Sequence, residues 1–186
     1  MRIAFVDTET TGWNAVYHRV IEIGIVLVEN GEVLERYESL VNPKSSVSST
    51  ITHITGLTDE DVADAPTFAE IAPKVESLLD GALFVAHNVG FDYSFLYYEF
   101  TRLQRPFHFP RACTVRLSRK LFPETPKHSL ESLISHHDIS VERRHRALDD
   151  AQVLYEFMKK CEARCGREEL SRLMGTLTNT TRLSGI

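Results

Sequence analysis

The stretch RIAFVDTETTGW, residues 2–13, begins as a strand and ends in two acids. Its run of four apolar residues predicts a strand apolar enough to lie at the centre of a sheet. Side chains alternate along a strand, so Asp7 and Glu9 are expected on the same face as Phe5. Two neighbouring carboxylates repel each other and resist burial. A group that neutralises them is therefore expected at the end of this strand.

The composition predicts one globular domain in a reducing compartment. The chain has 186 residues, 42% hydrophobic and 25% charged, enough to bury a sizeable core. Its three cysteines are an odd number, which does not favour a disulfide framework. No apolar run approaches the roughly 20 residues of a membrane span, and we expect a cytoplasmic protein. The net charge of −5 argues against binding duplex DNA through a broad basic face, but not against a locally gripped nucleic acid.

The pattern along the chain predicts an α/β protein with a mixed sheet. Strands are expected near residues 2–7, 20–29, 32–41 and 82–86, with the Asn-Gly pair at 30–31 as a tight hairpin turn. Helices are expected near residues 68–80, 90–103, 114–121, 129–136 and 147–164, with short helical turns within 42–66. A hairpin followed by helices alternating with short buried strands is typical of the α/β class.

The chain is expected to divide near residue 165. Residues 1–165 should form the main domain. From Gly166 the hydrophobic pattern weakens, and the chain ends in the polar run GTLTNTTRLSGI. We therefore expect residues 166–186 to be a C-terminal helix, a tail or a linker.

A third acid lies within HNVGFDYSFL, residues 87–96. On a helix that begins near Gly90, Asp92 shares a stripe with the apolar Phe95 and Leu96. An acid placed within an apolar stripe indicates a functional site. An acid in the first turn of a helix is also favoured by the helix dipole alone, so both interpretations stay open.

The segment ERRHRALDDAQVLYEF, residues 142–157, carries a histidine just before a helix and two acids in its first turn. Helical steps of three, four and seven from Asp150 reach apolar residues, whereas those from Asp149 reach mostly polar ones. Asp150 is therefore expected to face the core and Asp149 the water. Taken alone, His145 would be interpreted as an exposed loop histidine.

Three arginines flank this histidine, at positions 143, 144 and 146. They could steer the phosphates of a nucleic acid. A solvated loop would explain Arg143, Arg144 and Arg146 equally well, so both interpretations stay open.

Four carboxylates thus occur in three separated segments, each at the end of a strand or the start of a helix. Sites in α/β sheets form at such ends. Converging carboxylates suit hard cations such as Mg²⁺ or Mn²⁺. Two such ions, roughly 3.5–4 Å apart, can clamp the attacking and leaving oxygens of a phosphodiester displacement.

The motifs VDTETTG, HNVGFDYSFL and HRALDDA together resemble the three exonuclease motifs of the DEDDh family. The resemblance is strongest to the proofreading epsilon subunits of bacterial replicative DNA polymerases and their stand-alone relatives, and it runs from about residue 2 to 160. It implies a ribonuclease-H-like fold: a mixed five-stranded sheet, with its first three strands antiparallel, flanked by helices.

The resemblance also implies roles for individual residues. His145 becomes the general base that activates water, and Asn88 a support for the site. Phe91 would pack near the terminal sugar, and Leu57, in HITGLTDED, would wedge against the last bases. The metal-site acids would be Asp7, Glu9, Asp92 and Asp150. The loop that touches the 3′-terminal nucleotide would contain Thr10, Thr11 and Gly12.

The function that follows is 3′–5′ exonuclease activity on DNA. Two divalent ions, Mg²⁺ or Mn²⁺, would assist release of nucleoside 5′-monophosphates, preferably from single-stranded or frayed 3′ ends, in proofreading or repair. The expected partners are DNA and either a DNA polymerase subunit or a larger parent protein. Trimming of RNA 3′ ends is the main alternative, because the residues that sense a 2′-OH cannot be identified from the sequence.

Two further alternatives come from other functional classes. A phosphatase-like hydrolase would use a strand-end D-x-D-x-T motif, which DTETT nearly matches. Glu9, one methylene too long, argues against it, and HRALDDA would have no role. A non-catalytic nucleic-acid-binding module is the other alternative, and the complete set of acids argues against it.

Overall fold

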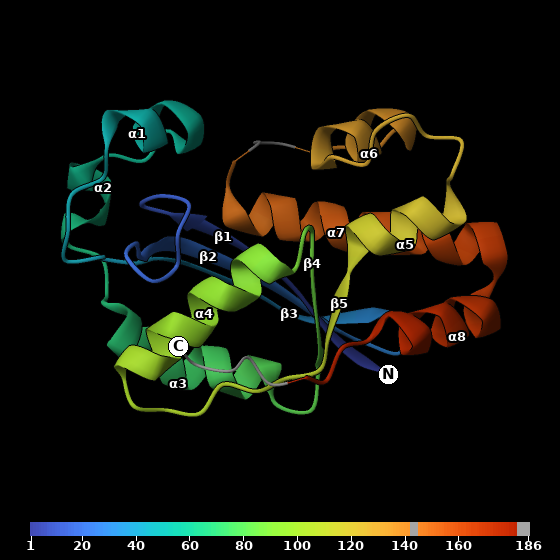
Figure 1. Ribbon diagram of the computed structural model, residues 1–186, viewed down its shortest axis with the longest axis horizontal. Coiled ribbons are helices and arrows are strands. Elements are labelled where there is room, and N and C mark those ends of the chain that lie inside the picture. Colours follow the sequence, from blue (N-terminus) through green and yellow to red (C-terminus); the bar gives the residue numbers. More distant parts are fainter. Residues whose placement is uncertain (142–144, 182–186) are drawn as a thin grey trace.

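The computed structural model describes residues 1–141 and 145–181, which contain one five-stranded mixed sheet (Figure 1). Its strands are β1 Arg2–Thr10, β2 Val20–Glu29, β3 Glu32–Leu40, β4 Leu83–Ala86 and β5 Arg111–Cys113. They lie in the order β3-β2-β1-β4-β5, so β1 is central, as expected. The pairs β1–β2 and β2–β3 are antiparallel, and β4 and β5 continue the sheet in parallel.

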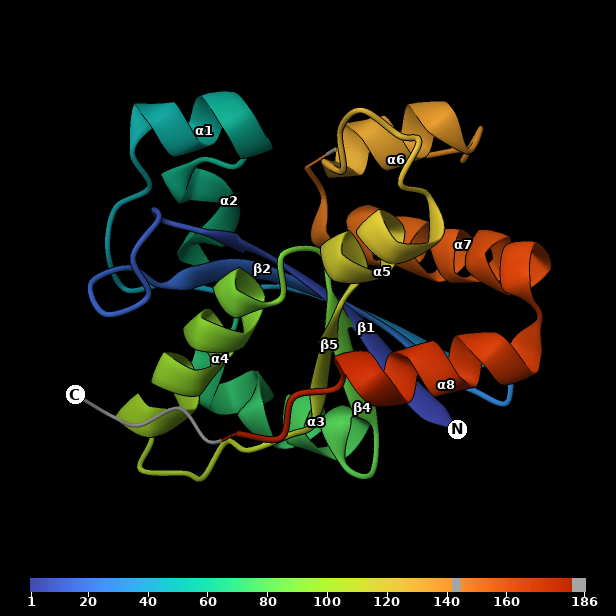
Figure 2. The ribbon, with the colours of Figure 1, turned by 45° about the vertical axis from the view of Figure 1, so that its right-hand side comes forward.

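Helices cover both faces of this sheet. Their bounds are α1 Ser49–Thr55, α2 Asp59–Ala63, α3 Phe68–Leu79, α4 Gly90–Arg102, α5 Thr114–Leu121, α6 Leu130–His136, α7 Ala147–Cys165 and α8 Arg167–Leu177. Figures 1 and 2 show α3 and α4 on one side of the sheet and α5, α7 and α8 on the other. Within the part of the chain that the structure describes, no helix is long and apolar enough to cross a membrane.

The side chains of β1 alternate between two cores. Ile3 and Phe5 belong to the core formed with α7 and α8, whereas Ala4 and Val6 belong to the core formed with α3 and α4. Because this alternation continues, the two acids at the end of β1 emerge on the α7 side and Thr8 emerges on the α4 side. The strand therefore presents polar groups to both α7 and α4.

The N-terminal end of α7 lies directly on β2 at Gly24. A Cβ atom at this position would collide with the backbone of Ala147 and Leu148. In the β1–β2 register Gly24 stands opposite Asp7. The missing side chain thus allows α7 to begin beside the acidic end of β1.

The C-terminal segment is part of the packed structure as far as residue 181. The apolar face of α8 carries Leu170 and Met174 into the α7 core. Beyond the helix, Asn179 and Arg111 of β5 exchange two backbone hydrogen bonds, of 2.8 and 3.0 Å, at the sheet edge. The expected domain boundary near residue 165 stays a prediction.

Candidate active site

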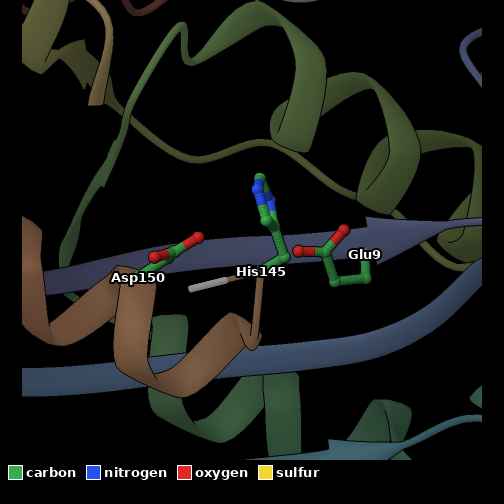
Figure 3. A group of neighbouring side chains, drawn as sticks. All are labelled: Glu9, His145 and Asp150. Carbon is green, nitrogen blue, oxygen red and sulfur yellow. The ribbon is translucent and has the colours of Figure 1, made fainter. Parts of the chain in front are cut away.

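Three side chains from two distant segments meet beside the end of β1 (Figure 3). Glu9 comes from β1, His145 from the residue pair before α7, and Asp150 from the first turn of α7. One ligand atom of each lies within 4.8 Å of the others. The sequence segments that carry these residues are therefore brought together as expected.

The two adjacent acids of α7 differ in burial as their helical spacing predicts. Asp150 is 4% exposed, and the core positions along the same stripe include Val153, Leu154 and Phe157. Asp149 is half-buried and outside the group formed by Glu9, His145 and Asp150. The burial of Asp150 is confirmed, while its role as a metal ligand stays a prediction.

Asp92 reaches the end of β1 from the other side. It lies in the first turn of α4, is 3% exposed, and accepts hydrogen bonds from the backbone N–H and the hydroxyl of Thr8, at 3.0 and 2.9 Å. Burial raises the pKa of Asp92 to about 7, while the hydrogen bonds from Thr8 oppose that rise. The third acid is thus anchored to the residue between Asp7 and Glu9. Of the four acids expected to bind metal, Asp7 and Asp92 are outside the three-residue group.

The loop after β1 is folded back on itself and tied to α4. The hydroxyl of Thr10 donates to the carbonyl of Gly12 at 2.7 Å, and the hydroxyl of Thr11 accepts from the backbone N–H of Arg19 at 3.0 Å. The guanidinium of Arg19 donates two hydrogen bonds of 2.8 Å to Glu99 of α4. Because Thr10, Thr11 and Gly12 are all buried, the structure gives them a role in shaping the loop. Their contact with a nucleotide stays a prediction.

The remaining expected substrate residues lie in different environments. Leu57 is 6% exposed and belongs to a small apolar cluster, so a contact with bases would require its side chain to leave that cluster. Asn88 is exposed, and its backbone φ of 59° lies in the left-handed region. Phe91 is half-buried against Phe95, with ring centroids 4.8 Å apart. Their proposed roles stay predictions.

An arginine of the third motif has a partner that the sequence analysis missed. Arg146 donates to Oε1 of Glu22 from Nε at 2.9 Å and from Nη2 at 2.6 Å. Its guanidinium is therefore held in an ion pair, and whether Arg146 also steers phosphates stays open. The lone charge in the otherwise apolar run VIEIGIVLV was the signal for this pair. Arg143 and Arg144 lie outside the described residues.

The donors at this site fit a divalent metal. Carboxylate oxygens are suitable ligands for Mg²⁺ or Mn²⁺. Asp92 and Asp150 are also almost fully buried, and a buried carboxylate is costly unless nearby groups compensate its charge. A cation is one such group, and Glu9 and Asp150 already lie together where it would bind.

Comparison with known proteins identifies the family. A family model described as "Exonuclease" matches residues 4–158. The chain is 37% identical over 166 residues to a protein named DNA polymerase III PolC-type from Oceanobacillus iheyensis. That alignment covers 89% of this chain and 12% of the polymerase, so the chain spans only a small part of its relative's length.

Solved structures agree on the fold. A structure of Exonuclease X in complex with 5′ overhanging duplex DNA has a TM-score of 0.74 and 25% sequence identity, and the match covers 93% of this chain and 99% of that one. The nuclease domain of 3′hExo, described as a DEDDh family member bound to rAMP, has a TM-score of 0.75 and 20% identity, covering 89% and 94%. The expected ribonuclease-H-like fold is confirmed.

Proposed function

The chain belongs to the exonuclease family, and from that membership we propose that it removes single nucleotides from the 3′ ends of DNA. The observation that carries the proposal is the meeting of Glu9, His145 and Asp150 at the end of the central strand. Asp92, held against the same strand end by Thr8, supplies a further acid. Acids from three motifs are thus all present at the end of β1, where we propose that a phosphodiester binds.

We assign the metal-binding role to Asp7, Glu9, Asp92 and Asp150, with two Mg²⁺ or Mn²⁺ ions. Such ions, when bound, lower the pKa of a coordinated water and stabilise negative charge on phosphate oxygens. The burial of Asp92 and Asp150 supports this assignment. A charged carboxylate loses hydration when it is buried, and a bound cation would compensate that cost.

His145 is assigned as the general base. Its imidazole lies near Glu9 and Asp150, where it can accept the proton of a water that attacks phosphorus. The water oxygen forms the new bond to phosphorus, the bond from phosphorus to the 3′ oxygen breaks, and that oxygen leaves with the shortened strand and takes a proton from solvent water. The products are a nucleoside 5′-monophosphate and a new 3′ hydroxyl end.

DNA is the proposed substrate because the sequence relative is a DNA polymerase. Single-stranded or frayed ends should be preferred, since a terminal nucleotide must leave the base stack before its phosphodiester can reach buried acids. Proofreading or repair beside a polymerase follows from the same relative, either as a separate subunit or within a larger parent protein. A cytoplasmic location stays a prediction.

A comparison of initial rates on three labelled substrates tests this function. Single-stranded DNA, single-stranded RNA of the same sequence and duplex DNA with a 3′-terminal mismatch are digested side by side with Mn²⁺. The proposal expects fast cutting of single-stranded DNA and of the mismatched end. Faster cutting of RNA would favour the RNA-trimming alternative, and binding without cutting would favour the non-catalytic module.

A further inference from the structure

Two residues of β2 lie opposite the acids of β1 and contact the segment that carries His145. In the antiparallel register Glu22 is paired with Glu9, and Gly24 is paired with Asp7. Gly24 permits the backbone of α7 to lie directly on the sheet. Glu22 holds the residues that connect His145 to that helix.

Both carboxylate oxygens of Glu22 are used. Oε1 accepts the two hydrogen bonds from Arg146, and Oε2 accepts the backbone N–H of Ala147 at 2.9 Å. The Glu22 side chain is 0% exposed, whereas that of Arg146 is 25% exposed. The bond to Ala147 satisfies one of the N–H groups that a helix leaves unpaired at its start, and a carboxylate is favoured there by the helix dipole.

His145 needs such a restraint. Its backbone φ of 58° lies in the left-handed region, which residues other than glycine rarely adopt. A residue in such a conformation keeps it only when its surroundings impose it. The next two residues, Arg146 and Ala147, are both bound to Glu22.

We propose that Glu22 is a positioning residue for catalysis, which places the His145 imidazole beside Glu9 by holding Arg146 and Ala147. This inference rests on the proposed function and adds a residue outside the family motifs quoted above. Glu22 itself is buried and touches neither substrate nor metal in this assignment. Its loss should therefore lower kcat and leave the KM for an oligonucleotide nearly unchanged.

Glu22→Gln tests the inference, because the amide keeps the side-chain length and removes the charge and one acceptor. We expect kcat on single-stranded DNA to fall about 10- to 100-fold, less than the roughly 10²–10⁴-fold loss expected when the general base itself is removed. KM should stay within about twofold. Glu38→Gln is the matched control: Glu38 also approaches Arg146, at 3.5 Å, but its side chain is 32% exposed. That control should keep kcat within about threefold.

A combination with His145→Ala separates positioning from a general structural role. If Glu22 acts through His145, adding Glu22→Gln to His145→Ala should lower kcat by less than about threefold, because the group being positioned is already absent. A purely structural defect would multiply the two losses. Multiplied losses, a change confined to KM, or an unchanged kcat in Glu22→Gln would each overturn the inference.

The two proposals fail in different ways. An inactive wild-type protein would contradict the proposed exonuclease function. An active wild type with a fully active Glu22→Gln would contradict only the positioning role. Should Glu22→Gln fail to fold, Arg146→Gln removes the same ion pair at its less buried partner. We expect the same loss of kcat, and the same test in combination with His145→Ala.

Discussion

Asp92 accepts two hydrogen bonds from Thr8, the residue between the two acids of β1. The pairing of β1 with β4 ends at Phe5, so the backbone N–H of Thr8 is available to the start of α4. Both bonds go to the same oxygen, Oδ1. This relationship joins the second acidic motif to the first and fixes where α4 begins relative to the sheet.

Thr8→Val should weaken that junction. Valine keeps the shape of threonine and the backbone N–H, but it removes the hydroxyl bond to the buried carboxylate of Asp92. Below about pH 7, where Asp92 is protonated, an intramolecular hydrogen bond contributes about 0.5–1.5 kcal/mol, so the free energy of unfolding should fall by about that amount in urea titrations.

Thr101→Val is the control for this substitution. Thr101 lies on α4 at an exposed position, where its hydroxyl donates only to the carbonyl of Tyr97 at 2.7 Å. A surface change of this kind should alter stability by less than about 0.5 kcal/mol. Equal losses in the two variants would show that the Thr8–Asp92 bond contributes little.

The raised pKa of Asp92 predicts how the metal-free protein responds to pH. Burial raises this pKa from 3.8 to about 7, so between these values the folded state binds a proton that the unfolded state lacks. The contribution of Asp92 to stability is therefore most favourable below that window and falls as pH rises through it. Asp92→Asn should gain stability relative to wild type between about pH 5 and about pH 8, by more than about 1 kcal/mol.

Urea unfolding of both proteins in EDTA measures this difference. The pH-dependent contributions of the other carboxylates cancel, because both proteins contain them. A stability difference between Asp92→Asn and wild type that does not change with pH would contradict the buried, protonated state of Asp92. Addition of Mn²⁺ should raise the free energy of unfolding of wild type more than that of the variant, which keeps the other three acids but lacks the charged carboxylate of Asp92.

The local patterns of the sequence predicted most of the fold. The Asn-Gly turn has both residues in the left-handed region, with φ of 53° and 92°, as its two residue types favour. The apolar stripe of α7 predicted which of its two acids is buried. Such features depend on neighbours within one or two turns of the chain, and periodicity detects them.

The missed features depend on contacts between distant segments. The bond between Thr8 and Asp92 joins residues 84 positions apart, and the pair between Glu22 and Arg146 joins residues 124 positions apart. Strand β5 has only three residues, too few for a periodic signal. Leu57 resembles a family position, but its burial is decided by the packing of α1 and α2 on β2.

The same substitution should affect nuclease activity strongly at Asp150 and hardly at all at Asp149. Asp150→Asn should reduce nuclease activity by more than about 100-fold, because its carboxylate lies with Glu9 and His145. Asp149→Asn, on the half-buried neighbour, should change activity by less than about threefold and stability by less than about 1 kcal/mol. Initial rates on single-stranded DNA decide, and the reverse ranking would overturn the assignment.

His145→Ala should separate a general base from a metal ligand. As a general base, His145 contributes on the order of 10²–10⁴-fold to the rate, and its loss should leave the half-saturating Mn²⁺ concentration nearly unchanged. A rise of more than about tenfold in that concentration would make His145 a ligand of the metal, a role that its place beside Glu9 and Asp150 also permits. Near-full activity at neutral pH would exclude both roles.

Metal-dependent removal of nucleotides from 3′ ends can be followed in a time course on 5′-labelled single-stranded DNA. Wild type is incubated with Mn²⁺, and a parallel reaction contains excess EDTA. We expect a ladder of labelled strands that shorten one nucleotide at a time with Mn²⁺, and intact DNA in EDTA. Equal cutting in EDTA, or a labelled mononucleotide as the first product, would contradict it.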